Sequence, residues 1–125
     1  MILDTYAAYL TAMGIRFRKH DSISVLLPDT MVNVYLHSNI ITLSDYVGLV
    51  NFVRPAKRLV KVLESRRPAY KIWPDKYSGY YEIEVEHRFP FTSIPALHQN
   101  VIEMAEMVAS GYQIGKEIVG PEFCK

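Results

Sequence analysis

The amino-acid sequence predicts a single-domain α+β fold in which helices pack on one face of an antiparallel sheet of about five strands. Three observations support this prediction. The chain has 125 residues, of which 50% are hydrophobic, so it can bury one core without disulfides or a metal. Its alternating, strand-like segments stand in blocks, which favours antiparallel pairing over a doubly wound parallel sheet. No repeat or low-complexity linker divides residues 1–125 into separate domains.

The first half of the chain should form one helix and then three or four short strands. Residues 2–13 carry apolar side chains at helical spacing, and Gly14 fits the position after a helix end. The next segments alternate apolar and polar residues between turn formers, which predicts antiparallel strands at 15–19, 22–27, 31–37 and 39–43. Ser44 and Asp45 are residue types that cap helices, so residues 46–53 could form a further short helix before the one that begins near Pro55.

The second half should contain two helices and a hairpin between them. Pro55 suits the first turn of a helix, and Pro68 ends that helix. Residues 69–89 predict a long hairpin around a loop that is rich in turn formers. The last helix should close at Gly111, which leaves residues 112–125 as a short helix or a terminal arm.

The predicted order of elements is therefore helix, strands, helix, hairpin, helix. This order is similar to that of the small dimeric chaperones of type III secretion. The resemblance rests on topology, so what it implies for this chain is a fold.

A dense group of basic residues lies between residues 54 and 67. This stretch carries six positive charges and one negative charge, a net of +5, whereas the rest of the chain has a net of −4. On a helix, one side would carry Arg54, Lys57, Arg58 and Lys61, and the opposite side Ala56, Leu59, Val60 and Leu63. We favour a solvated helix face over the alternative, a row that binds the phosphates of nucleic acid. That row would be extended by Arg66, Arg67 and Lys71.

Glu82, Glu84 and Glu86 alternate with apolar residues, which places their carboxylates on one face of a strand. Three aligned carboxylates could hold a divalent cation in a metal-dependent enzyme, although such sites normally draw ligands from several converging elements. We favour a solvated acidic row. Two further uses stay open: pairing across the hairpin with Lys71, or docking of the basic helix of a second copy.

The other chemically reactive residues form no recognisable motif. Four histidines are far apart and lack zinc-binding spacings: His20, His37, His87 and His98. The single cysteine, Cys124, cannot form an internal disulfide, which suits a reducing compartment. The sequence contains no Gly-rich phosphate loop and no nucleophile elbow. We therefore expect no cofactor and no metal, and enzymatic activity is the least favoured function.

Two candidate partner-binding surfaces stand out. A loop concentrates aromatic residues that are favoured as interface anchors: Trp73, Tyr77, Tyr80 and Tyr81. The same loop could stack nucleic-acid bases, or Trp73 and Tyr81 could face the core across the hairpin. Met104 and Met107 widen the apolar surface of the last helix beyond one stripe, which favours either a homodimer contact or a buried core helix.

The sequence thus favours a small non-enzymatic binding protein, with an adaptor or chaperone-like role, that forms a homodimer and engages an unknown protein partner. Nucleic-acid binding by the basic helix is the alternative, and a metal-dependent enzyme is the third hypothesis. No apolar run is long enough to span a membrane, and the first residues lack the basic start of a secretory signal. We expect a cytoplasmic protein, and the scarcity of glutamine and cysteine suggests a heat-adapted microbe or one of its viruses as the source.

Overall fold

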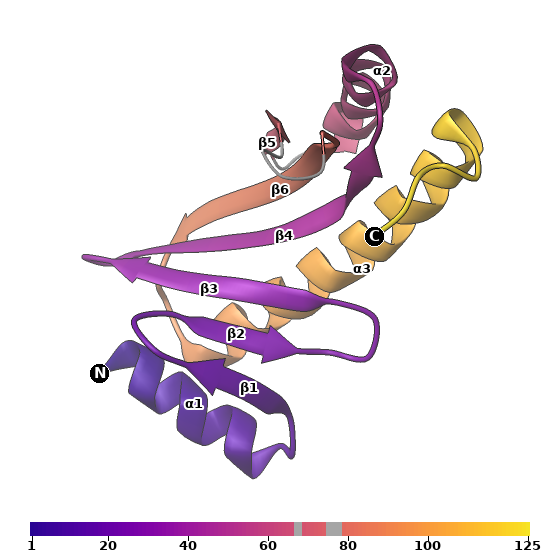
Figure 1. Ribbon diagram of the computed structural model, residues 1–125. Helices are drawn as coiled ribbons and strands as arrows, with labels where there is room; N and C mark the ends of the chain where they lie inside the picture. Colours follow the sequence, from indigo (N-terminus) through magenta and orange to yellow (C-terminus); the bar gives the residue numbers. More distant parts are fainter. Residues whose placement is uncertain (67–68, 75–78) are drawn as a thin grey trace. The chain divides into compact units, whose positions relative to one another are not determined.

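The computed structural model describes residues 1–66, 69–74 and 79–125 (Figure 1). Within these ranges the chain forms three α-helices, one short 3-10 helix and six strands. Their order is α1 (Ile2–Ala12), β1 (Arg16–Lys19), β2 (Ile23–Leu26), β3 (Met31–His37), β4 (Ile40–Val50), α2 (Val53–Leu63), η1 (Glu64–Arg66), β5 (Ala69–Pro74), β6 (Tyr81–Pro90) and α3 (Ile94–Val119). The predicted α+β fold class and the order of the helices are confirmed.

The strands form one antiparallel sheet with the order β1-β2-β3-β4-β6-β5 in the part of the chain that is described. Strands β1 to β4 follow one another as a meander, because short turns suffice to join antiparallel neighbours. β5 and β6 make the predicted second hairpin, with a register that runs from Ala69 opposite Glu86 to Pro74 opposite Tyr81. β1 and β5 are the edge strands of this sheet.

Contacts within the chain define two compact units. The first unit comprises Met1–Asp45 and His87–Glu106, and the second comprises Tyr46–Glu86 and Met107–Lys125. Strand β4 and helix α3 each contribute residues to both units. We describe the core of each unit separately.

In the first unit, α1 and the first part of α3 pack together against the meander. Every second residue of β2 is buried, as expected where one sheet face lies in the core. The core residues include Tyr6, Leu10, Ile23, Val25, Val32, Val34, Ile41, Leu43, Leu97, Val101 and Met104. Asp45 is only 4% exposed, and its carboxylate accepts a hydrogen bond from the Thr30 hydroxyl. This bond satisfies a buried polar group.

In the second unit, α2, β4 and the last part of α3 meet at close range. A methyl group on Gly111 would lie 3.2 Å from Cγ1 of Val47 and 3.6 Å from Cδ2 of Leu63. The core of this unit includes Val47, Val50, Ala56, Leu59, Val60, Leu63, Tyr70, Ile83, Val85, Val108 and Phe123. The apolar side of the amphipathic helix α2 therefore lies in the core, as its spacing predicts.

The predicted helix over residues 46–53 is wrong, because most of this segment is the second half of β4. Val47 and Val50 are β-branched and buried, and such residues favour strands. The expected capping residue Asp45 uses its carboxylate to accept the Thr30 bond instead of capping a helix. The side chain that the sequence suggested as a helix cap thus makes a tertiary hydrogen bond.

The predicted end of the last helix at Gly111 is also wrong, because α3 continues to Val119. Gly111 is buried, and its missing side chain allows the close approach of β4 and α2. Glycine inside a helix costs about 1 kcal/mol relative to alanine, so this residue marks tight packing and not a helix end. None of the helices in the described ranges is both long and apolar enough to cross a membrane.

Candidate interaction surfaces

Five side chains share one face of the β5–β6 hairpin, which we call the hairpin face: Lys71, Trp73, Glu82, Glu84 and Glu86. The strand register sets this arrangement. Lys71 stands opposite Glu84, and Trp73 stands opposite Glu82. Residues that are directly opposite in an antiparallel pair point to the same side of the sheet. The intervening apolar residues of β6 are buried, so the opposite face of the hairpin belongs to the core.

Trp73 is the exposed aromatic residue of the hairpin face. It is 48% exposed, although tryptophan is highly buried on average. The ammonium of Lys71 lies 3.2 Å from Oε2 of Glu86 and 6.0 Å from the centre of the Trp73 ring. The expected pairing of the acidic row with Lys71 is therefore found at Glu86. A large apolar ring here stands beside charged groups of both signs.

Glu84 lies in the middle of the acidic row, and its surroundings raise the pKa of its carboxyl group above the ordinary value. The main cause is partial burial, followed by the negative charge of Glu86. A hydrogen bond with the Trp73 side chain and the positive charge of Lys71 act in the opposite direction but do not cancel the rise. The hairpin face therefore holds more negative charge than Lys71 offsets, and it suits a positively charged partner.

The other predicted partner-binding residues are placed differently from Trp73. The alternative that Trp73 faces the core is wrong, since this ring lies on the same face as the acidic row. Tyr80 is half-buried, and Tyr77 lies outside the described residues. On α3, Met104 is 2% exposed and packs in the core, whereas Met107 is half-buried. Trp73 is thus the partner-binding candidate with the largest free surface among those described.

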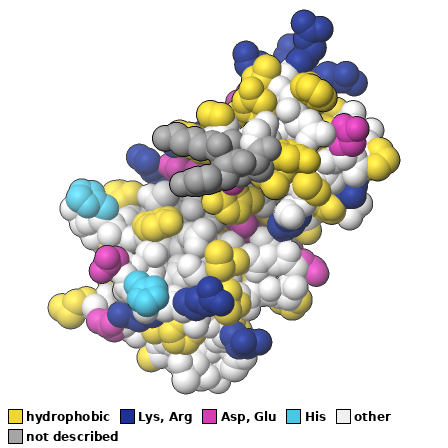
Figure 2. Space-filling model, viewed as in Figure 1, with side chains coloured by type: hydrophobic (Ala, Val, Ile, Leu, Met, Phe, Trp, Pro, Cys, Tyr) yellow, Lys and Arg dark blue, Asp and Glu magenta, His cyan; other side chains and the backbone are white. Residues whose placement is uncertain are grey.

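α2 carries the predicted basic row on its exposed side, where Lys and Arg side chains gather (Figure 2). The exposed residues of this row are Arg54, Lys57, Arg58 and Lys61. Among the described residues, none of these four cations has an ion pair or hydrogen bond. The side chains of Arg66 and Arg67 lie outside the described part of the chain, and Lys71 belongs to the hairpin face. Counted over the described residues, the row therefore consists of four unpaired charges on one helix face.

Phe52, the residue before α2, is an exposed apolar residue that we did not single out from the sequence. It is 67% exposed and lies next to the first residue of α2, which is 41% exposed. The sequence signal was an aromatic residue directly before a basic helix. It passed unnoticed because residues 46–53 were expected to be helical.

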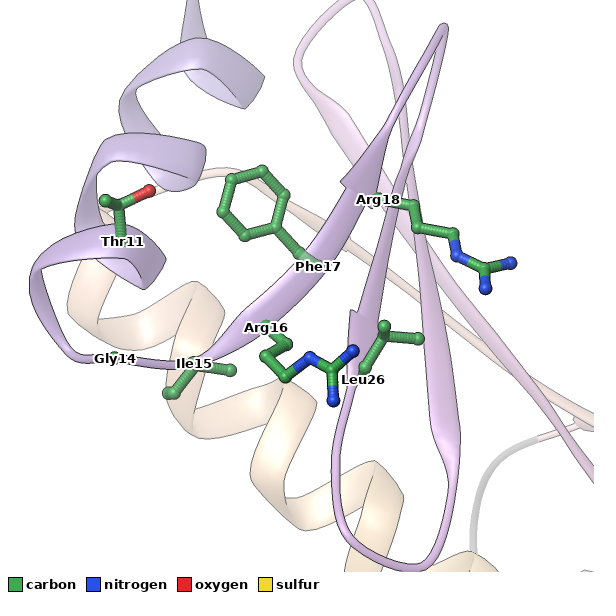
Figure 3. Close-up of a pocket in the computed structure, with 7 residues that line it drawn as sticks. All are labelled: Thr11, Gly14, Ile15, Arg16, Phe17, Arg18 and Leu26. Atoms are coloured by element: carbon green, nitrogen blue, oxygen red, sulfur yellow. The ribbon is translucent and has the colours of Figure 1, made fainter.

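A second overlooked feature is an open hollow of about 450 Å³ at the edge strand β1. Phe17 points toward α1, whereas Arg16, Arg18 and Leu26 project on the other side of the strand (Figure 3). Arg16 stands opposite Leu26 in the register. Exposed basic residues on an edge strand discourage unwanted pairing with other chains, which accounts for this pattern.

The histidines are not gathered into one site. His98 Nδ1 lies 2.9 Å from the Tyr6 hydroxyl, and burial holds the pKa of His98 below its ordinary value. His20 and His37 are exposed, and the half-buried His87 lies beside Phe89, as expected for a strand residue near the core. In the described residues, no group of three or more His, Cys, Asp or Glu side chains is placed to hold a metal ion.

Comparison with known proteins places this chain by its fold. The architecture is an α+β fold built on a six-stranded antiparallel sheet, counted over the described residues. It is similar to that of YbjN from E. coli, described as a "putative transcription regulator", with a TM-score of 0.69 and 14% identity over 98% of this chain and 95% of that one. It is also similar to a chain of the HopA1–SchA chaperone–effector complex, with a TM-score of 0.58 and 14% identity over 89% and 90% of the two chains.

Sequence comparisons add no family to this likeness. No family model matches the chain, and no curated protein matches it either. Identity of 14% to the structural neighbours shows a shared fold.

Proposed function

We propose that the protein acts by binding another protein, in an adaptor or chaperone-like role, and that it does so as a homodimer. The observation that carries the proposal is the 48% exposure of Trp73 beside Lys71 and the acidic row. Interface hot spots combine a large aromatic anchor with a polar surround that excludes water. The hairpin face has this composition, and the partner surface that complements it is apolar and basic. The likeness to a chain from a chaperone–effector complex supports the same class of function.

The test is affinity capture of the partner from cells that produce the protein, with matched surface variants. Trp73→Ala removes the aromatic anchor, and the double change Glu82→Lys with Glu84→Lys reverses the charge of its surround. Both variants should lose the same captured protein. Tyr35→Ala is the control, because Tyr35 is 46% exposed on β3 and lies outside the hairpin face. An undiminished yield with Trp73→Ala would exclude this face as the contact.

Binding can then be measured directly, because Trp73 is the single tryptophan of the chain. Adding the captured partner should shift the Trp73 emission to shorter wavelength, since docking would remove the indole from water. An unchanged spectrum at saturating partner would place the contact elsewhere. The Tyr35→Ala variant should give the wild-type shift.

A second candidate function, nucleic-acid binding by α2, is favoured by one specific observation. The four cations of the basic row are exposed and unpaired among the described residues, and Phe52 provides an exposed ring beside them. Cations that follow phosphates release counterions, so such binding weakens steeply with salt. An exposed ring can add base stacking to single strands.

Fluorescence anisotropy with labelled duplex and single-stranded oligonucleotides tests this second candidate. Arg58→Glu with Lys61→Glu should abolish binding if α2 is the contact. Arg16→Glu with Arg18→Glu makes the same charge change on β1 and should leave a specific α2 contact largely intact. Absence of binding at low salt removes this function.

A further inference from the structure

The segment after α3, residues 120–125, folds back onto the second unit, and we call it the hook (Figure 1). The Leu49 amide donates a hydrogen bond to the Cys124 carbonyl at 2.6 Å, and the Cys124 amide donates one to the Leu49 carbonyl at 3.4 Å. The hook therefore forms a short antiparallel bridge to β4. Phe123 is 0% exposed although Glu122 and Cys124 on either side of it are exposed. One aromatic ring thus fastens an otherwise exposed segment.

Two glycines create the space that the Phe123 ring fills, which we call the socket. A methyl group on Gly48 would lie 2.4 Å from Cζ of Phe123, and one on Gly115 would lie 2.3 Å from its Cε2. Both distances are far below van der Waals contact, so no side chain larger than hydrogen fits at either position with the ring in place. The ring of Tyr112 lies 5.5 Å from that of Phe123 and forms a further wall.

The socket is built at a cost to the elements that form it. Glycine weakens both a strand interior and a helix interior, yet Gly48 lies in β4 and Gly115 lies in α3. The hook also has a specific polar contact, because the side-chain amide of Asn51 donates a hydrogen bond to Oε2 of Glu122 at 3.3 Å. The recognition chemistry is therefore that of strand addition: backbone pairing gives attachment and one pocket selects a phenylalanine.

We propose that the socket and the β4 backbone at Leu49 are a docking site for an extended segment with an aromatic side chain, and that the hook of a second copy occupies it in the homodimer. The inference rests on the homodimer of the proposed function and supplies its contact. The contacts of Phe123 and Cys124 define the occupant, because the segment that fits the socket is the chain's own hook. Exchange between two copies preserves the ring contacts and both backbone bonds.

The junction between α3 and the hook suits such an exchange. The amide of Gly120 donates a hydrogen bond to the Lys116 carbonyl, and Gly120 has a φ of 97°, a backbone conformation that favours glycine. The direction of the hook is therefore set at one glycine, beyond the end of the helix. Redirecting the chain at Gly120 leaves α3 and the socket unchanged. Two exchanged hooks fill two sockets, so the assembly closes as a dimer.

A disulfide reports whether the hook docks within a chain or between chains. Leu49 and Cys124 are a hydrogen-bonded antiparallel pair, so their Cα atoms are about 5.5 Å apart, within the range that a disulfide bridges. The Leu49→Cys variant is prepared in ¹⁴N and ¹⁵N forms, which are mixed, unfolded and refolded together, and then oxidised. Mass spectrometry reads the isotopes of the two peptides joined between position 49 and Cys124. Wild-type protein and Leu49→Cys with Cys124→Ser are the controls for random oxidation.

The proposal predicts joined peptides of mixed isotope in the Leu49→Cys variant. Peptides of matching isotope alone would show that the hook docks only within its own chain, which overturns the exchange. Absence of the disulfide would overturn the docking itself. Light scattering on the unmodified protein separates failure of the hook contact from failure of the homodimer. A dimer that gives only matching isotopes keeps the proposed homodimer and rejects the hook as its contact. A monomer rejects both.

A second pair of variants avoids any dependence on the engineered cysteine. Phe123→Ala empties the socket and should convert the dimer to monomer in light scattering at equal concentration. Phe52→Ala removes an equally large ring of the same unit that is 67% exposed, and it should leave the dimer intact. A folded Phe123→Ala variant that remains dimeric would contradict the proposal.

Discussion

At Glu84, partial burial and the charge of Glu86 raise the pKa of the carboxyl group above its ordinary value. A raised pKa means that the folded state favours the protonated form. Its contribution to stability is full below the unfolded-state pKa and is lost as the pH rises through the folded-state value. The negative charge of Glu84 therefore opposes folding at neutral pH.

Glu84→Gln should raise the guanidinium midpoint of unfolding at pH 7, because the amide removes the charge and can still accept the Trp73 bond. The gain should shrink as the pH falls toward about 4, where the wild-type carboxyl is itself protonated. Chemical denaturation at several pH values measures this. Glu103→Gln on the exposed side of α3 is the control, and an equal gain there would show a general effect of net charge.

For His98, the predicted change of folding stability with pH has the opposite sign to that for Glu84. Burial lowers its pKa below the ordinary value, and its Nδ1 lies 2.9 Å from the Tyr6 hydroxyl. The folded state favours the neutral ring, so stability is present above the unfolded-state pKa of about 6.5 and is lost as the pH falls below it. His98→Gln should flatten the loss of stability between about pH 7.5 and 5.5, whereas His37→Gln, at an exposed position, should retain it. Equal slopes in all three proteins would contradict this role for His98.

At the scale of elements, α3 tests the account of the socket. Alanine in place of glycine stabilises a helix interior by about 1 kcal/mol when nothing obstructs it. Gly115→Ala should nevertheless destabilise the protein, because its methyl group would lie 2.3 Å from the Phe123 ring. Gly111→Ala should be close to neutral, since its methyl group would meet Val47 at 3.2 Å, where a small shift suffices. Thermal unfolding compares the two variants, and equal midpoints would argue against a rigid socket.

The same elements show what the sequence could and could not predict. The two sides of α2 followed from its periodicity, because a 3.6-residue repeat sorts cations from core residues without knowledge of the rest of the fold. The acidic row followed from the period of two in β6. The face taken by Trp73 did not follow, because it depends on the register between β5 and β6.

Close approach between segments that are far apart in the sequence was the second feature that the sequence could not predict. Gly111 was expected to end the last helix, and Gly48 lies in the segment for which a helix was predicted, but both permit contacts with residues far away in the sequence. Phe123 lies in a segment with two glycines and a proline nearby, a composition typical of exposed arms. Its burial depends on the space that Gly48 and Gly115 leave. Single-sequence patterns carry no information on such pairs.

At the scale of the whole molecule, the near-neutral net charge of +1 conceals two surfaces of opposite charge, the basic row of α2 and the acidic hairpin face. Docking of one on the other between two copies is the alternative route to a homodimer. The two routes respond differently to salt. Charge pairing across an exposed surface is screened within about 10 Å at 0.1 M salt, whereas a buried ring and backbone hydrogen bonds are not.

Light scattering should therefore give twice the chain mass of 14.4 kDa at about 50 μM protein, with no decrease between about 0.1 and 0.5 M salt. The reason is that the buried Phe123 ring and the backbone hydrogen bonds with Leu49 hold the hook, and neither depends on exposed charges. A mass that falls toward the monomer with rising salt would favour docking of α2 on the hairpin face. A monomer under all conditions would remove the homodimer from the proposed function.

The central claim is that the protein binds a protein partner through the hairpin face. Photo-crosslinking in cells that produce the protein tests this claim most directly. Trp73 is replaced by benzoyl-phenylalanine, and Tyr35 is replaced in the same way as a control of similar exposure. The account predicts a light-dependent adduct with a partner protein from position 73, which disappears when Glu82→Lys and Glu84→Lys are added. Adducts that are absent from position 73, or no stronger there than at position 35, would contradict it.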